Sequence, residues 1–353
     1  TTYGKISGRN DSYDTIEKVA NIKVINNGNI IGKAGTNNEN QVGFGFNNFD
    51  TSSNNTRTEM INRGKIEIGA TKSAGFQLRP ESYYSDQRNK QSGLVIMSGE
   101  NTGTITLNGH GSFGFLTVKN KQSGAEQVAD YDNYKVKATA GGQIASRSKP
   151  SEMSYMKNSG TININSDGSV GVGLLHNIQA VYAGGTINVA GASSVGVYTE
   201  VATRPVLDGN KDDHGLKNTT GNIVGTETVE VSGTITVSGN NSSGVFAKNN
   251  GSITLKDNTI NPLADSDNKT TAKINVSGTK SYGAVLEGLK LDLEKNTQIT
   301  VTGKEAIGYV LKSGTGSNKG KIEVSGHSGN TQTNPSLGFY GEAGTFTNEA
   351  DSG

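Results

Sequence analysis

Two stretches of the chain, residues 158–172 (NSGTININSDGSVGV) and residues 62–76 (NRGKIEIGATKSAGF), have the same length and the same order of residue types. Both begin with Asn-x-Gly and continue into an isoleucine-centred alternation of apolar and polar residues. Both then pass through a polar turn and end in Ser-x-Gly followed by an apolar residue. Such self-similarity indicates a unit that buries its apolar face against neighbouring copies of itself.

The repeat extends along most of the chain. Further copies centre on Ile105, Ile187, Ile235, Ile274 and Ile299, and in all seven copies the second glycine lies nine residues after the isoleucine. Copies with altered spacing centre on Ile30 and Ile322, with Gly43 and Gly338 as the matching glycines, and partial copies centre on Ile253 and Phe346. The sequence therefore predicts about ten or eleven units.

The alternation within each unit predicts a short strand. In residues 161–165 a period of two places Ile162 and Ile164 on one face and polar residues on the other. The isoleucines recur every 23 to 25 residues at Ile162 and Ile187, and again from Ile274 to Ile322, as expected for one turn of a coil. We therefore predict an all-β fold, a right-handed parallel β-helix (β-solenoid) of about ten rungs with loop insertions, as a single domain over residues 1–353.

Two polar residue types recur in phase with the repeat. The asparagines of Asn-x-Gly and the serines of Ser-x-Gly are predicted to form ladders of hydrogen bonds at the corners of the coil, because every turn needs its corners stabilised. The asparagines are Asn26, Asn62, Asn101, Asn158, Asn249 and Asn318, and the serines are Ser73, Ser112, Ser169, Ser194, Ser242, Ser281 and Ser336.

Composition narrows the classes of function. With 33 basic and 32 acidic residues spread along the chain, no basic surface is expected to bind nucleic acid. The chain has no cysteine, and no run of 18 apolar residues that would predict a membrane-spanning helix. An exported protein without disulfides is the favoured interpretation.

The amino-acid sequence of the repeat resembles that of a known family. Residues 185–189 (GTINV), 193–198 (SSVGVY) and 318–326 (NKGKIEVSG) are similar to the passenger domains of type V autotransporter adhesins, and most of all to the very large fusobacterial outer-membrane adhesins. The resemblance implies a monomeric extracellular rod at the cell surface, anchored by a C-terminal outer-membrane β-barrel that lies outside this chain. It also implies attachment to a host-cell receptor or glycan, or to other bacteria. No binding residue can be transferred, because the matching motif is the scaffold.

Unequal spacing between copies predicts surface insertions at about residues 79–93, 119–157, 200–229 and 257–271. Tyrosine and arginine often anchor interfaces, and tyrosine faces stack on sugar rings, so the first two insertions are predicted to form a contact surface. Its candidate residues are Tyr83, Tyr84, Arg88, Tyr131, Tyr134, Arg147 and Tyr155. The alternatives are that these tyrosines only pack the loops onto the rod, or that the whole segment is a passive spacer.

Catalysis and cofactors are not expected. A polysaccharide-degrading β-helix enzyme would need clustered carboxylates in a groove, whereas the strand-borne Glu67 and Glu323 belong to distant copies. Residues 208–213 (DGNKDD) begin like a calcium loop, but Thr219 occupies the position of the usual bidentate glutamate. We therefore expect no catalytic residues, no metal site and no cofactor.

Overall fold

The computed structural model describes residues 21–35, 39–45, 56–78, 95–117, 155–175, 178, 180–200, 229–258, 270–325 and 335–349. All regular secondary structure in these residues is β-strand, and the named strands pair in parallel. Within these ranges no helix is long and apolar enough to cross a membrane.

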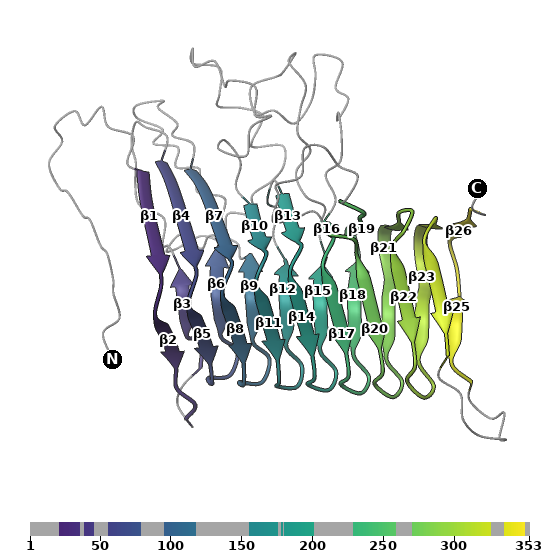
Figure 1. Cartoon of the computed structure of the whole chain (residues 1–353), viewed down its shortest axis with the longest axis horizontal. Helices are drawn as coiled ribbons and strands as arrows, with labels where there is room; N and C mark the ends of the chain where they lie inside the picture. The colour runs from purple at the N-terminus through teal and green to yellow at the C-terminus, as the bar shows by residue number, and fades with distance from the viewer. Residues whose placement is uncertain are drawn as a thin grey trace, which may run out of the picture.

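The strands form three columns, here called face 1, face 2 and face 3, and each turn of the chain adds one strand to each face in that order (Figure 1). Face 1 contains β1 (Asn21–Asn26), β4 (Thr56–Asn62), β7 (Val95–Asn101), β10 (Tyr155–Asn158), β13 (Ala180–Ala183), β16 (Val229–Val231), β19 (Ser252–Leu255) and β26 (Thr345–Asn348). Face 2 contains β2 (Asn29–Gly32), β5 (Lys65–Ile68), β8 (Thr104–Leu107), β11 (Thr161–Ile164), β14 (Thr186–Val189), β17 (Thr234–Val237), β20 (Lys273–Val276), β22 (Gln298–Val301) and β24 (Lys321–Val324). Face 3 contains β3 (Val42–Gly45), β6 (Ala74–Leu78), β9 (Phe113–Thr117), β12 (Val170–Leu174), β15 (Val195–Thr199), β18 (Ser243–Lys248) and β25 (Leu337–Gly341). The long strands β21 (Tyr282–Leu293) and β23 (Ile307–Asn318) run through face 3 and continue into face 1 of the next turn.

Face 2 contains the isoleucine of each repeat. Nine isoleucines occupy equivalent positions of neighbouring strands, from Ile30 in β2 to Ile322 in β24. This register confirms the predicted parallel β-helix. The prediction of separate units at Ile253 and Phe346 is wrong, because both lie on face 1, where Ile253 pairs with Leu291 and Phe346 pairs with Gly316.

The strands of face 1 were not assigned from the sequence. Some of them end at the asparagine of Asn-x-Gly, as in Thr56–Asn62, but others end at an apolar residue, and their sequences differ from turn to turn. The segment Val229–Val231, for example, is only three residues long. A strand this short gives too few alternating positions to be recognised without its neighbours.

The core consists of columns of side chains stacked along the rod. Phe76 and Phe115 stack with ring centroids 4.6 Å apart and an interplanar angle of 7°, and Phe44 continues the stack at 5.1 Å from Phe76. The same column continues through Val172, Val197, Val245, Ala284, Tyr309 and Phe339. Because equivalent strands lie one hydrogen-bonding distance apart, identical positions stack directly and form one continuous apolar core.

Both predicted ladders are present. The side-chain amide of Asn62 donates to Asn101 at 2.8 Å, and Asn101 donates to Asn158 at 2.8 Å. In the serine ladder the backbone N–H of each serine donates to the hydroxyl of the next, at 3.0 to 3.1 Å from Ser73 to Ser281. The prediction for Asn249 is wrong. It lies in the turn before β19 with φ of 54°, and the ladder position of that turn is Leu255.

The glycine of Ser-x-Gly is required by close contact between turns. A Cβ atom on Gly171 would lie 2.5 Å from the carbonyl oxygen of Gly196, and one on Gly114 would lie 2.4 Å from that of Gly171. Since real Cβ atoms do not approach an oxygen this closely, any other residue here would push the turns apart. This explains why the position is glycine in all seven regular copies.

Tyr309 gives the rod a predictable response to alkaline pH. Its buried hydroxyl donates to the carbonyl oxygen of Leu291 at 2.9 Å. Burial raises the pKa of the phenol, and the charge of Asp292 raises it further. The unfolded chain releases this proton near its ordinary pKa of about 10, so the stability that Tyr309 contributes is complete below that pH and is lost as pH rises towards the folded pKa.

We therefore expect Tyr309→Phe to lower the free energy of unfolding by about 1 kcal/mol at neutral pH, through loss of the hydrogen bond. The variant should also lose less stability than the parent chain between about pH 9.5 and 11. Urea unfolding across this range measures both effects, and Tyr340→Phe, at an exposed tyrosine, is the control. An identical alkaline slope in Tyr309→Phe and the parent chain would contradict this assignment.

Candidate functional site

Three of the four predicted insertions begin and end at the same corner of the rod. They connect a face 3 strand with the next face 1 strand, namely β6 with β7, β9 with β10, and β15 with β16. Other turns cross this corner with few residues, as between β18 and β19, or with none, as in β21 and β23. Because the turns stack in register, the described ends of all three insertions lie along one edge of the rod (Figure 1).

The fourth insertion leaves at a different corner, between β19 and β20. Its two ends are joined by an antiparallel bridge between Asp257 and Thr271, where the Thr271 hydroxyl donates to Asp257 Oδ1 at 2.7 Å. Asn296 of the following turn donates to the other carboxylate oxygen at 2.8 Å. These bonds fasten the insertion to the rod at its base.

Of the predicted contact residues, only Tyr155 lies within the described part of the chain. Tyr83, Tyr84, Arg88, Tyr131, Tyr134 and Arg147 lie outside it, as does the calcium-like stretch at residues 208–213. The predicted boundaries also need correction. Tyr155 begins strand β10 and Val229 begins β16, so residues 155–157 and 229 belong to the rod and not to insertions.

Tyr155 lies on the outer side of face 1, opposite Ser98 of β7. Burial raises the pKa of its phenol, a hydrogen bond with Ser98 lowers it, and the charges of Glu100 and Glu59 raise it. Tyr155 is therefore part of the rod surface at the base of the longest insertion.

Carboxylates lie on the outer side of face 1, whose strands are not predicted by the repeat. Glu59 pairs with Lys23 at 3.3 Å, and Glu100 pairs with Lys157 at 3.7 Å. Further along the rod, Asp292 pairs with Lys290 at 2.7 Å. The prediction that Glu67 and Glu323 are the strand-borne carboxylates is wrong, because the strands of face 1 carry Glu59, Glu100 and Asp292 as well.

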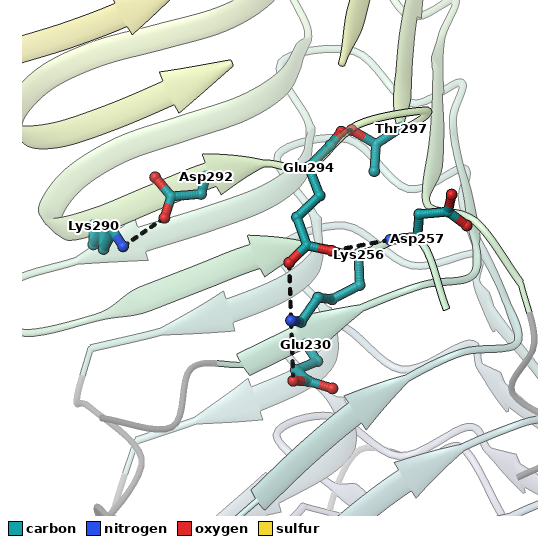
Figure 2. Close-up of polar contacts among 7 residues, drawn as sticks. All are labelled: Glu230, Lys256, Asp257, Lys290, Asp292, Glu294 and Thr297. Atoms are coloured by element: carbon teal, nitrogen blue, oxygen red, sulfur yellow. Dashed lines mark hydrogen bonds and ion pairs between the residues drawn. The ribbon is translucent and has the colours of Figure 1, made fainter. Parts of the chain in front are cut away.

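The densest charged group on this face is the Glu230–Lys256–Glu294 cluster (Figure 2). Lys256 directly follows β19, and its Nζ lies 2.9 Å from Glu294 Oε1 and 3.7 Å from Glu230 Oε1. The other oxygen of Glu294 accepts the backbone N–H of Asp257 at 3.3 Å. One lysine thus joins carboxylates from the turns on either side of its own.

The charges of this cluster depend on one another. Burial raises the pKa of Glu230 and Glu294 raises it further, against the lowering effect of Lys256. For Lys256, burial lowers the pKa, but contacts with Glu294 and Glu230 outweigh burial and leave it raised. The lysine thus favours the ionised form of Glu230 against the effect of burial, and the two glutamates favour the ionised form of the lysine. Among the residues that the structure describes, no group of three or more His, Cys, Asp or Glu side chains could hold a metal ion.

Replacement of Lys256 by methionine should expose the repulsion between the two glutamates. We expect a loss of about 1 kcal/mol of stability at neutral pH, as for a partly exposed pair. Without the lysine, Glu230 favours the folded state only while it is protonated, because its pKa in the folded chain is raised. This contribution to stability is present at low pH and is lost as pH rises through the raised pKa. The deficit should therefore shrink towards about pH 4, as measured by urea unfolding at several pH values.

Lys290→Met, at an exposed pair on the same face, provides the control and should cost less. A deficit in Lys256→Met that is independent of pH would mean that the glutamates do not sense the lysine.

The sequence contained a signal for this cluster that was missed. In VEV at Val229–Val231 the two valines are buried and Glu230 faces outward, and LDL at the end of β21 has the same pattern.

Comparison of the chain with protein-family models, with curated proteins and with solved structures found no match.

Proposed function

We propose that this chain is the rod segment of a bacterial surface adhesin that binds a host-cell receptor, a surface glycan or a partner bacterium through its insertions. The observation that carries the proposal is the shared corner, at which three insertions begin and end along one edge of the rod. Insertions on one edge of a rigid repeat scaffold can act together on one partner. The tyrosines and arginines of residues 79–94 and 118–154 supply the side chains suited to such contacts.

A spacer is the second candidate, and the C-terminal turns favour it for their part of the rod. β21 and β23 cross the same corner as continuous strands, so these turns present no insertion there. They hold other parts of the rod at a fixed distance without offering a contact loop at this corner.

The test is binding of the purified chain to a glycan array and to host cells, beside a variant with residues 119–154 replaced by a short Gly-Ser linker. The matched control replaces residues 259–269, which belong to the insertion at the other corner. We expect at least a tenfold loss of binding in the first variant and none in the control.

Substitution of Tyr131 and Tyr134 by alanine should reproduce much of that loss. Equal binding by the parent chain and the first variant would reject this insertion as the contact site. No binding by any form would favour the spacer.

A further inference from the structure

The outer side of face 3 is apolar, unlike that of the neighbouring face 2. In four successive turns the outward residues of face 3 are Val195 and Tyr198, Ser243 and Phe246, Tyr282 and Val285, and Ile307 and Val310. The outward residues of face 2 in the same turns are Thr186 and Asn188, Thr234 and Thr236, Lys273 and Asn275, and Gln298 and Thr300. The side of a sheet that faces solvent normally carries polar residues, so the apolar outer side of face 3 indicates a binding partner.

The centre of this apolar face is hollowed. Val285 and Val310 form the floor, each with only 4% of its surface exposed, and Phe246, Tyr282 and Tyr340 rise around them. Tyr340 at one end is 43% exposed. The groove has a volume of about 310 Å³ and runs across the turns from β15 to β25.

Charges of alternating sign border the apolar face where its strands end. Glu200, Lys248, Glu287, Lys312 and Glu342 follow one another in successive turns, and Lys312 lies 3.3 Å from Glu287. At the opposite border Lys280 pairs with Glu305 at 3.6 Å. A border that carries both positive and negative side chains is compatible with contact between two identical surfaces. Neither copy then presents charges of a single sign that would repel the other copy.

We propose that the apolar face 3 binds the same face of a second copy of this chain, so that two rods pack side by side. The two sheets would pack face to face at roughly 10 Å, as the sheets of a β-sandwich do. A two-fold axis lying in the plane between the two faces would relate the copies, with aromatic side chains of each able to contact the apolar floor of the other.

The available area is consistent with this occupant. The seven turns from β9 to β25 span about 30 Å at the spacing of parallel strands, and a five-residue strand is roughly 16 Å long. This gives about 500 Å² per copy and on the order of 1,000 Å² in total, at the lower limit for a specific interface. Such a dimer would be weak and reversible in solution, and would be favoured where many rods are held on one surface.

A dimer of this kind differs from the monomer that the family resemblance implies, and its formation does not depend on binding by the insertions. The experiment is sedimentation velocity of the parent chain from about 1 μM to a few hundred μM, in which a concentration-dependent dimer should appear. The double variant Phe246→Lys and Tyr282→Lys should weaken association at least a hundredfold, because each lysine would be buried against an apolar floor. Asn275→Lys and Thr300→Lys place the same charges on face 2 and should leave association unchanged.

Cross-linking tests the proposed dimer without introducing lysines into the interface. Since the chain has no cysteine, single substitutions Val195→Cys, Tyr282→Cys and Tyr340→Cys can be treated with a short bis-maleimide. At least one should give a cross-linked dimer, and Asn275→Cys should not.

A chain that stays monomeric at every concentration and fails to cross-link would overturn the proposal. So would a dimer that the face 3 lysines do not weaken, or a monomer whose face 3 binds an oligosaccharide or an apolar peptide.

Discussion

Replacement of Gly233 by alanine should destabilise the rod by about 3 kcal/mol or more, the upper range for overpacking. A Cβ atom on Gly233 would lie 1.9 Å from the carbonyl oxygen of Gly185 and 2.6 Å from the carbonyl carbon of Gly184. These are backbone atoms, so no side-chain rotation can relieve the contact. The neighbouring turns would have to separate, with loss of the parallel hydrogen bonds between β14 and β17.

Gly28 offers a matched control for this prediction. It occupies the equivalent place in its own turn, two residues after the ladder position of face 1, yet a Cβ atom there would have as its nearest neighbour an oxygen 4.0 Å away, in Asn26. Gly28→Ala should therefore change stability by less than about 0.5 kcal/mol. Thermal unfolding followed by circular dichroism would compare the two variants. Equal transitions for both would show that the turns yield more easily than the structure implies.

Loss of the buried amide in Asn101→Ala should cost about 2 to 4 kcal/mol, because two buried partners lose a hydrogen bond at once. Asn101 is fully buried, accepts from Asn62 and donates to Asn158, each at 2.8 Å. Its removal leaves a donor in Asn62 and an acceptor in Asn158 without their partner in the ladder. Urea unfolding of the variant measures the loss.

Asn26→Ala removes the end of the same ladder at a half-buried position on the first described turn, where water can replace the lost bond. We expect a cost of at most about 1 kcal/mol there. If Asn101→Ala and Asn26→Ala were equally destabilised, burial could not be the source of the ladder's contribution.

The sequence predicted those parts of the fold that every turn repeats. The isoleucine column, the serine ladder and the glycine spacing are in register because each position has the same neighbours in each turn. The same residue type is therefore required at that position in every turn, and it recurs in the sequence. Face 1 could not be found in this way, since its strands share only the alternation of buried and outward residues. Its ladder position changes from Asn158 to Ala183 and then to Val231 along the rod.

The Glu230–Lys256–Glu294 cluster illustrates the limit for site residues. Lys256 and Glu294 lie 38 positions apart in the chain, and only the stacking of β19 on β21 brings them together. The alternating charges along face 3 likewise become neighbours only when the turns are aligned. Sequence periodicity gives the spacing between turns, but contacts between turns require the register of every strand.

The corner between face 3 and face 1 has a practical consequence for protein engineering. In different turns it is crossed by continuous strand, by the three residues 249–251, or by the much longer 118–154, while the strands on both sides keep the same alignment. The length of the connection is thus uncoupled from the geometry of the coil. Foreign peptides grafted between Thr117 and Tyr155 should be displayed without disturbing the turns above and below, which makes the rod a linear array of interchangeable display positions.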